Sequence, residues 1–246
     1  MLLGDFHIHS NFSDGVLTIS EIVDLYGSRG FDVIAITDHL CESESFLGKW
    51  AKRLDQTLTP ETWPVYLNII ESEGARAMDQ YGMLLLSGFE ISKNSVSNSR
   101  SAHLIGLGVP NFVYADGDVY DIAKSIKEIG GTTIAAHPVW TRVMEKQTFH
   151  LWDRRSEMSE VIDAWECTRN FKILEEVTKS RLPVIASSDL HKPNHLSSWK
   201  TIVHSEKHPE AVLDAIKNQN LSFKIFNDSN GGSNGNNMCA PILSYI

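Results

Sequence analysis

The sequence contains little cysteine, no long apolar run and a deficit of positive charge. Only 3 of its 246 residues are cysteine. Their number is odd, so a disulfide framework is not expected, and they lack the spacing of a metal site. We therefore interpret Cys41, Cys167 and Cys239 as reduced thiols. No apolar stretch is long enough to cross a bilayer, and no charged segment precedes an apolar one after Met1. We therefore expect neither a membrane partner nor a signal peptide, which favours a cytoplasmic location.

The charge balance is acidic, with 22 Lys and Arg residues against 31 Asp and Glu residues and a formal net charge of −9. A surface that covers a nucleic acid needs clustered Lys and Arg, so no stable nucleic-acid partner is expected. An excess of carboxylates is compatible with a site that holds several cations, because bound metal would neutralise some of them. The hydrophobic and charged fractions, 42% and 22%, are those of an ordinary globular protein.

Apolar runs and helical patterns alternate along most of the chain. We predict strands over 2–8, 33–38, 83–89, 103–107, 132–136, 161–166 and 183–188, with shorter ones over 201–203 and 221–226. Helices are expected over about 18–30, 62–81, 116–129, 170–179 and 209–217. The first is opened by a capping box of Thr18 and Glu21, the third is capped by Asp116 or Asp118, and the fourth is capped by Asn170. This alternation predicts one α/β barrel over residues 1–226 and a low-complexity tail over 227–246. Segments 40–60 and 139–160 are expected either to cover the barrel mouth or to be solvated connectors.

The fourth predicted strand differs from the others because its histidine, His103, precedes the apolar run instead of following it. Only residues 91–102 join this strand to Glu90, which closes the third strand. An antiparallel hairpin between the third and fourth strands would bring Glu90 and His103 to the same end of the sheet. We predict that hairpin.

Histidines and carboxylates gather at the ends of the predicted strands. His7 and His9 alternate along the first strand, so their side chains share one face about 6–7 Å apart, where two imidazoles can bind one divalent metal. A lone histidine is more often a core residue, but further candidates recur at the later strand ends. The candidate ligands are His7, His9, Asp14, His39, Glu90, His103, His137, Asp189 and His191. The other histidines, His150, His195, His204 and His208, lie in polar stretches and are assigned to the surface.

These ligand types also limit the choice of metal. Imidazole and carboxylate ligands without thiolates suit Zn, Mn or Fe(II), and nine groups are too many for one ion. The sequence therefore predicts two or three divalent metal ions at the barrel mouth.

Taken together, these motifs resemble those of the PHP (polymerase and histidinol phosphatase) family of metal-dependent phosphoesterases. The matching motifs are His7-Ile8-His9 with Ser13-Asp14-Gly15, then Thr37-Asp38-His39, Gly88-Phe89-Glu90, His103 with Gly106-Leu107-Gly108, His137-Pro138 and Ser188-Asp189-Leu190-His191. They occur in the order of the family and extend over residues 5–191.

The resemblance implies a distorted (βα)7 TIM-like barrel with a trinuclear metal centre. On this resemblance one metal is held by His7, His9, Glu90 and Asp189. Glu90 bridges to a second metal, whose other ligands are His103 and His137. The third metal is held by Asp14, His39 and His191. Some relatives have histidine where this chain has Asp14, which can alter the metal preferred at that position. Asp5 and Asp38 are interpreted as partners that orient the imidazoles, or as residues that make local strand-end hydrogen bonds.

The chemistry expected of such a centre is the hydrolysis of a small phosphate monoester or nucleotide. Carboxylate-bridged metals generate hydroxide near neutral pH, which attacks phosphorus directly. Glu90, Asp189 and His191 are the expected catalytic residues; the leaving-group proton comes from His191, a neighbouring group or metal-bound water. Candidates to bind the substrate phosphate are Arg142, Arg169 and Lys192, which follow strand ends, and Arg100 in the predicted hairpin loop, although for each taken alone a solvated surface charge is slightly favoured over substrate contact.

Two other functions fit the first strand motif. Amidohydrolase-type barrels also begin with His-x-His and hydrolyse C–N bonds, but they usually add a bridging lysine, a role that Glu90 fills here. A non-catalytic, metal-stabilised binding domain would generally have an incomplete ligand set. Histidinol-phosphate phosphatase and exonuclease activities are alternatives within the phosphoesterase class, the latter disfavoured by the acidic chain.

Overall fold

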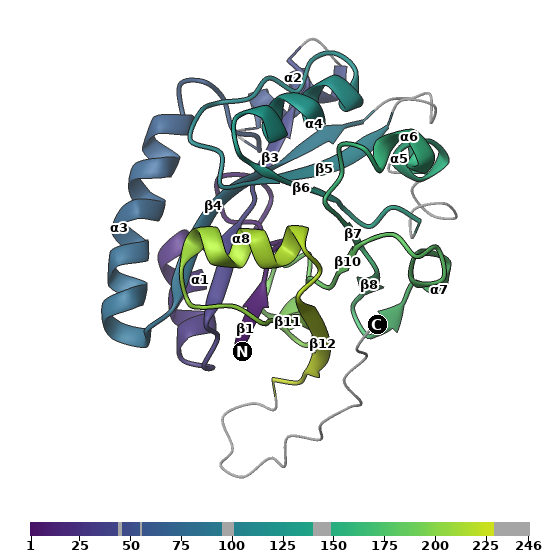
Figure 1. Cartoon of the computed structure of the whole chain (residues 1–246). Helices are drawn as coiled ribbons and strands as arrows, with labels where there is room; N and C mark the ends of the chain where they lie inside the picture. Colours follow the sequence, from purple (N-terminus) through teal and green to yellow (C-terminus); the bar gives the residue numbers. More distant parts are fainter. Residues whose placement is uncertain (44–45, 55, 95–100, 140–148, 229–246) are drawn as a thin grey trace.

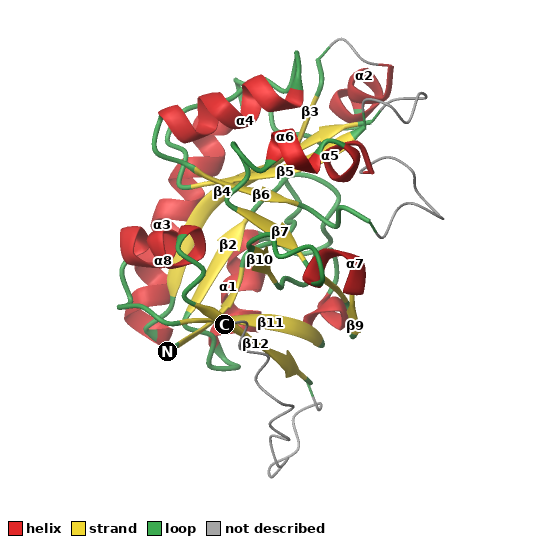
Figure 2. Cartoon of the chain, turned by 45° about the vertical axis from the view of Figure 1, so that its right-hand side comes forward, coloured by secondary structure: helices red, strands yellow, loops and turns green. Residues whose placement is uncertain are grey.

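The computed structural model describes residues 1–43, 46–54, 56–94, 101–139 and 149–228. A mostly parallel, barrel-like sheet lies at its centre (Figures 1 and 2). Its strands are β1 (Leu2–Asp5), β2 (Val33–Ile36), β4 (Leu84–Lys93), β5 (Ala102–Leu107), β6 (Thr132–Ala135), β7 (Ala164–Glu166) and β10 (Val184–Ile185). They follow one another in the order β10-β7-β6-β5-β4-β2-β1.

The barrel is nearly closed just beyond β1 and β10. Ile8 and Leu190 form a parallel bridge there. The N–H of His9 donates to the Leu190 carbonyl at 2.8 Å, and the N–H of Leu190 donates to the His7 carbonyl at 3.1 Å. The distorted α/β barrel predicted from the sequence is thereby confirmed. Two further strands, β11 (Ser198–Val203) and β12 (Leu221–Phe226), extend the sheet antiparallel from the first half of β1.

Strand β10 is shorter than the predicted strand over 183–188. The reason is that the N–H groups of Ala186 and Ser188 donate to side chains, Thr201 Oγ1 at 3.1 Å and Asp5 Oδ1 at 3.0 Å, instead of to a neighbouring strand. The chain therefore leaves the regular ladder before it reaches Asp189.

Strands β4 and β5 pair antiparallel, as the hairpin hypothesis requires. Glu90 lies opposite Ile105 and Ser92 opposite His103, so both candidate ligands lie near one end of this pair. A short strand, β3 (His39–Cys41), pairs parallel with the same part of β4 and places His39 opposite Glu90. The length of β4 thus allows one strand to gather side chains from β3 and β5.

Helices cover the outside of the sheet, and their ends follow the capping signals of the sequence. They include α1 (Ile19–Gly27), α3 (Trp63–Tyr81), α4 (Val119–Glu128) and α8 (Pro209–Lys217). The predicted capping box is confirmed: Thr18 Oγ1 accepts from the N–H of Glu21, and the Glu21 carboxylate accepts from the N–H of Thr18. Asp118 caps α4 by accepting from the N–H of Tyr120 at 2.8 Å. Figure 1 shows α3 flanking the long strand β4.

Apolar side chains on the two faces of the strands belong to two separate clusters. Ile34 and Ile36 of β2 pack in the larger cluster with residues of α1, α3 and α4. Val33 and Ala35 point the opposite way and join a cluster that includes Val212 and other residues of α8. The strands are therefore buried on both faces, as their continuous apolar sequences indicate.

The predicted helix from Asn170 to about Lys179 is wrong in its first half. Residues 168–173 form a hairpin of β8 (Thr168–Arg169) and β9 (Lys172–Ile173), and only α7 (Glu175–Thr178) is helical. Asn170 lies in the hairpin turn with φ of 52°, a left-handed conformation that asparagine tolerates better than most residues. The turn is held by Trp199, whose N–H and indole Nε1 donate to the carbonyls of Asn170 and Phe171.

The two long connecting segments contain short helices. These are α2 (Phe46–Arg53) in the first segment and α5 (Phe149–Asp153) and α6 (Arg155–Met158) in the second, while residues 140–148 lie outside the described residues. A 3-10 turn, η4 (Pro193–Leu196), follows His191. In the described part of the chain, no helix combines the length and apolarity needed to span a bilayer. Most of the predicted tail, from residue 229 on, is also outside that part.

Candidate metal centre

All nine candidate ligands converge at one end of the barrel. Their donor atoms form overlapping groups in which every pair lies within 4.8 Å: His9, Asp14, His39 and His191; His7, His137 and Asp189; His7, His9 and Glu90; and Glu90, His103 and His137. His7, His9 and Glu90 are completely buried. The two imidazoles of the first motif turn their Nε2 atoms toward each other at 3.0 Å. Side chains from opposite ends of the sequence thus share one small volume.

Two of these residues, His137 and Asp189, have backbone conformations that only a constrained chain maintains. Their φ angles are 29° and 54°, in or near the left-handed region that residues other than glycine rarely adopt. Each lies shortly after the end of a barrel strand, His137 two residues past β6 and Asp189 four residues past β10. Such conformations concentrate at functional sites, where surrounding contacts hold them.

Glu90 is the central acidic group of the cluster. Five imidazole nitrogens lie within 3.7 Å of its carboxylate oxygens, those of His7, His9, His39, His103 and His137. Its Oε2 lies 2.8 Å from Nδ1 of His39 but forms no hydrogen bond of acceptable geometry, although it is fully buried. A buried carboxylate oxygen without a hydrogen bond is unfavourable unless a cation is also bound there. This orphaned atom, together with the imidazole and carboxylate donors, fits a divalent metal.

A second acidic group, Asp14, lies on the more exposed side of the cluster. Its Oδ1 is 3.3 Å from Nε2 of His39 and 3.2 Å from Nε2 of His191. The His191 side chain is 26% exposed, against 16% for His39 and none for His9. Solvent therefore reaches the cluster from the side of Asp14 and His191.

His7 and His9 are neighbours, but their pKa values shift in opposite directions. Burial alone would lower the pKa of His7, yet the carboxylates of Glu166 and Asp189 outweigh it and hold that pKa well above its ordinary value. For His9, burial and the adjacent His39 lower the pKa to about 3. Without a metal, the surroundings therefore favour the neutral form of His9 and the protonated form of His7.

Metal binding at this cluster is predicted to release protons. Burial alone would lower the pKa values of His39 and His191. At His39 the carboxylates of Glu90 and Asp14 outweigh burial and raise the pKa. At His191 the carboxylates of Asp14 and Asp189 do the same. A metal ligates only the neutral imidazole, so affinity for Mn²⁺ or Zn²⁺ should rise as pH increases above 6.5. Isothermal titration calorimetry in buffers of different ionisation enthalpy measures the protons released. Heats that do not depend on the buffer would contradict this prediction.

The sequence-based reasoning missed Glu166, the last residue of β7. It is 2% exposed. Its Oε1 lies 2.9 Å from Nδ1 of His7, and its Oε2 accepts from the backbone N–H of His137 at 2.8 Å. The available signal was its position at the end of the sixth predicted strand, the same kind of position that identified the other candidates.

His195 was also misassigned, because it is partly buried beside the cluster instead of lying on the open surface. The backbone N–H of His191 donates to its Nδ1 at 3.3 Å, and the two rings lie 6.1 Å apart. The turn of η4 brings it there, a feature that its polar sequence surroundings did not reveal.

Asp38 and Asp5 differ in their relation to the imidazoles. Asp38 accepts from Ser13 Oγ at 2.6 Å, and that hydroxyl lies 3.4 Å from Nδ1 of His9, so Asp38 reaches an imidazole only through Ser13. Asp5 accepts instead from Ser188, Tyr26 and Lys200. Its role is therefore to join strands below the cluster.

The four candidate phosphate-binding residues divide into two pairs. Arg169 donates from its guanidinium to Asp189 Oδ2 at 3.0 Å and is partly buried at the cluster. Lys192 is exposed and directly follows His191. Arg100 and Arg142 lie outside the described residues.

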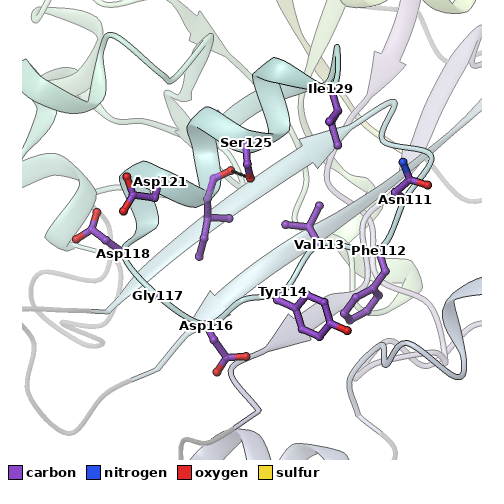
Figure 3. A pocket seen from close by; sticks show the side chains of 11 residues that line it. Asn111, Phe112, Val113, Tyr114, Asp116, Gly117, Asp118, Asp121, Ser125 and Ile129 are labelled. Carbon is purple, nitrogen blue, oxygen red and sulfur yellow. Dashed lines mark hydrogen bonds between the residues drawn. The ribbon is translucent and has the colours of Figure 1, made fainter.

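A separate cavity of about 460 Å³ lies along α4, away from the nine residues. Figure 3 shows that its lining includes the aromatic rings of Phe112 and Tyr114 and the carboxylates of Asp116, Asp118 and Asp121. None of the candidate ligands lines it, so it does not belong to the cluster.

The first part of the chain matches a known domain family and a curated relative. Residues 5–107 match the PHP domain family. The chain is 30% identical over 106 residues to the 3′,5′-nucleoside bisphosphate phosphatase of Chromobacterium violaceum. The matched stretch covers 43% of this chain but only 27% of that protein.

Solved structures share the fold. A two-domain protein from Bacteroides vulgatus, containing a predicted PHP-like metal-dependent phosphoesterase, superposes with a TM-score of 0.69 and 20% identity over 91% of this chain and 64% of that one. A candidate metal-dependent phosphoesterase from Bifidobacterium adolescentis gives a TM-score of 0.51 and 15% identity over 77% of this chain and 88% of that one. At these identities the likeness establishes the fold.

Proposed function

We propose that this protein, whose residues 5–107 match the PHP domain family, is a metal-dependent phosphoesterase that hydrolyses a small phosphate monoester or nucleotide. The observation that carries the proposal is the convergence of nine imidazole and carboxylate side chains with donor atoms within 4.8 Å in each group. The relative from C. violaceum, named as a nucleoside bisphosphate phosphatase, supports a phosphorylated small molecule as the substrate class.

The ligand set divides into three groups in this proposal. His7, His9, Glu90 and Asp189 would hold one metal, Glu90, His103 and His137 a second, and Asp14, His39 and His191 a third. Nitrogen and carboxylate donors without thiolate suit Zn, Mn or Fe(II). When bound, these cations would supply a hydroxide nucleophile at neutral pH and neutralise charge on the phosphate.

The protein side chains would position the substrate and move its protons. Glu90, in contact with five imidazoles, would hold two ligand groups together. The leaving oxygen would take its proton from His191, whose side chain is the most exposed among the candidate-ligand histidines at 26%, or from a neighbouring group. Arg169 would contact the phosphate while paired with Asp189, and Lys192 would attract the anion from solution.

A phosphatase panel tests this function. Protein reconstituted separately with Mn, Zn and Fe(II) is offered mononucleotides, 3′,5′-bisphosphates, cyclic phosphates and histidinol phosphate. We expect metal-dependent phosphate release from at least one class. His204→Ala is the control and should retain full activity, because His204 is exposed and bonds Ser222. Release of ammonia from amide substrates alone would favour an amidohydrolase, and ligand binding without turnover would favour a binding domain.

A further inference from the structure

Glu166 lies on β7, and the neighbouring strand on each side of β7 leads to a candidate ligand. Strand β7 pairs parallel with β6, which leads to His137, and with β10, which leads to Asp189. Ile185 is the cross-strand partner of Glu166, so the carboxylate lies level with the end of β10. It is 2% exposed, and a carboxylate this buried requires partners for both of its oxygens.

The two oxygens of Glu166 bind groups from strands that are not neighbours in the sheet. Oε1 lies 2.9 Å from Nδ1 of His7, which follows β1. Oε2 accepts the backbone N–H of His137, which follows β6, at 2.8 Å. One side chain therefore connects two candidate ligands across the barrel mouth, and His137 is held in its left-handed conformation, with φ of 29°.

This contact also determines which nitrogen of His7 is available to a metal. A carboxylate accepts hydrogen bonds but does not donate them, so Nδ1 of His7 carries a hydrogen. Nε2 is then the atom left to bind a metal, in place of any proton that it carries without one, and it faces Glu90 Oε1 and Asp189 Oδ1, each at 3.4 Å. A ligating histidine whose other nitrogen is bound by a carboxylate is fixed in both orientation and tautomer.

We propose that Glu166 is a positioning residue that fixes the Nε2-ligating tautomer of His7 and, through the backbone of His137, couples two of the metal-binding groups. The inference rests on the proposed metal-dependent function. It assigns Glu166 no contact with the substrate. Its effect is on the metals bound by His7 and His137, whereas the group of Asp14, His39 and His191 has no contact with it.

The test compares metal binding by the wild type and Glu166→Gln. The amide has one acceptor oxygen, so either His7 Nδ1–H or the N–H of His137 loses its acceptor and faces an N–H₂ group. We expect metal affinity to fall roughly 10–100-fold for the Mn²⁺ or Zn²⁺ ions that these two histidines ligate. Elemental analysis after equilibrium dialysis measures this loss, with the remaining metal unaffected. In the Zn²⁺-bound protein, nitrogen-15 NMR should show that His7 loses its single tautomer.

Asp163→Asn is the matched control. Asp163 precedes β7 at its opposite end, its side chain is 8% exposed, and its Oδ2 accepts from the N–H of Thr133 at 3.0 Å. This variant removes a largely buried carboxylate next to the start of the same strand, so it should lower thermal stability and leave metal affinity unchanged. An equal loss of metal affinity in both variants would overturn the proposal, since Glu166 would then act only through the stability of β7.

Wild-type metal affinity in Glu166→Gln, with His7 still in one tautomer, would also overturn the proposal. If that variant does not fold, Glu166→Asp replaces it, because the shorter carboxylate keeps its charge but reaches His7 and His137 less well. A roughly tenfold weaker metal affinity is then expected, and unchanged affinity contradicts the proposal. These readings need no substrate. A protein that binds metal as described but hydrolyses no phosphoester would refute the proposed function and leave the role of Glu166 intact.

Discussion

Replacing Glu90 by alanine is expected to abolish metal binding and phosphoester hydrolysis together. The substitution removes the carboxylate that lies within 3.7 Å of five imidazoles and leaves those imidazoles without an anion between them. A metal contributes several kcal/mol of transition-state stabilisation, so activity should fall by about a thousandfold or more. Elemental analysis and phosphate release, measured on the same preparation, test both effects.

The matched control for this substitution is Glu160→Ala. Glu160 is exposed and accepts a hydrogen bond from the Tyr120 hydroxyl, away from the cluster. It should retain full metal content and activity. If Glu90→Ala also retained its metals and turned over substrate at a comparable rate, the assignment of the cluster as the active centre would fail. A Glu90→Ala variant that lost activity but kept every metal would indicate that Glu90 acts on the substrate instead of bridging metals.

Much of the fold and of the candidate centre was predictable because the signals are local. Apolar runs identified the barrel strands, and the residue after each run, such as Glu90 or His137, identified a position at the strand end. The antiparallel pairing of β4 and β5 followed from one anomaly, the position of His103 before its strand. Barrel topology then brings such positions together, and the nine side chains converge accordingly.

What the sequence did not reveal depends on contacts between distant segments. Glu166 has the same local context as Glu90, but its partners, His7 and His137, become neighbours only when the barrel closes. Asn170 has a side chain that suits both a helix N-cap and a left-handed turn, and the choice between them is made by Trp199, 29 residues further along the chain. Residue type alone cannot decide such cases.

Lys200 is the clearest example of a role set by tertiary structure. Lysine is almost never fully buried unless it is paired, and yet Lys200 has no exposed surface. Its Nζ lies 2.8 Å from Asp5 Oδ2 and donates to Ser198 Oγ at 2.7 Å. Burial lowers the pKa of Lys200, while Asp5 acts in the opposite direction. Tyr26 and Ser188 donate to the same Asp5 carboxylate, which completes the network.

Lys200→Met is therefore expected to destabilise the protein strongly. It preserves most of the side-chain volume but leaves the Asp5 carboxylate buried without a cation. Breaking a buried ion pair in this way typically costs about 3–5 kcal/mol. Equilibrium unfolding in urea, followed by circular dichroism, measures the change in the free energy of unfolding.

Lys207→Met is the control for this substitution, because Lys207 also pairs with an aspartate, Asp32, but is 34% exposed. An exposed pair contributes at most about 1 kcal/mol, so the two lysine variants should differ severalfold in the free energy of unfolding that they lose.

Asp5→Asn combined with Lys200→Met should recover much of the lost stability, since no unpaired charge remains. It should not recover all of it, because an amide has a single acceptor oxygen and cannot accept both from the backbone N–H of Ser188 and from the hydroxyls of Ser188 and Tyr26. Ser188 precedes Asp189, so a loss of metal affinity that persists in the double variant would locate the remaining effect at the metal centre. A cost below about 1 kcal/mol for Lys200→Met alone would mean that Asp5 is stabilised by its hydroxyl and amide donors without the lysine.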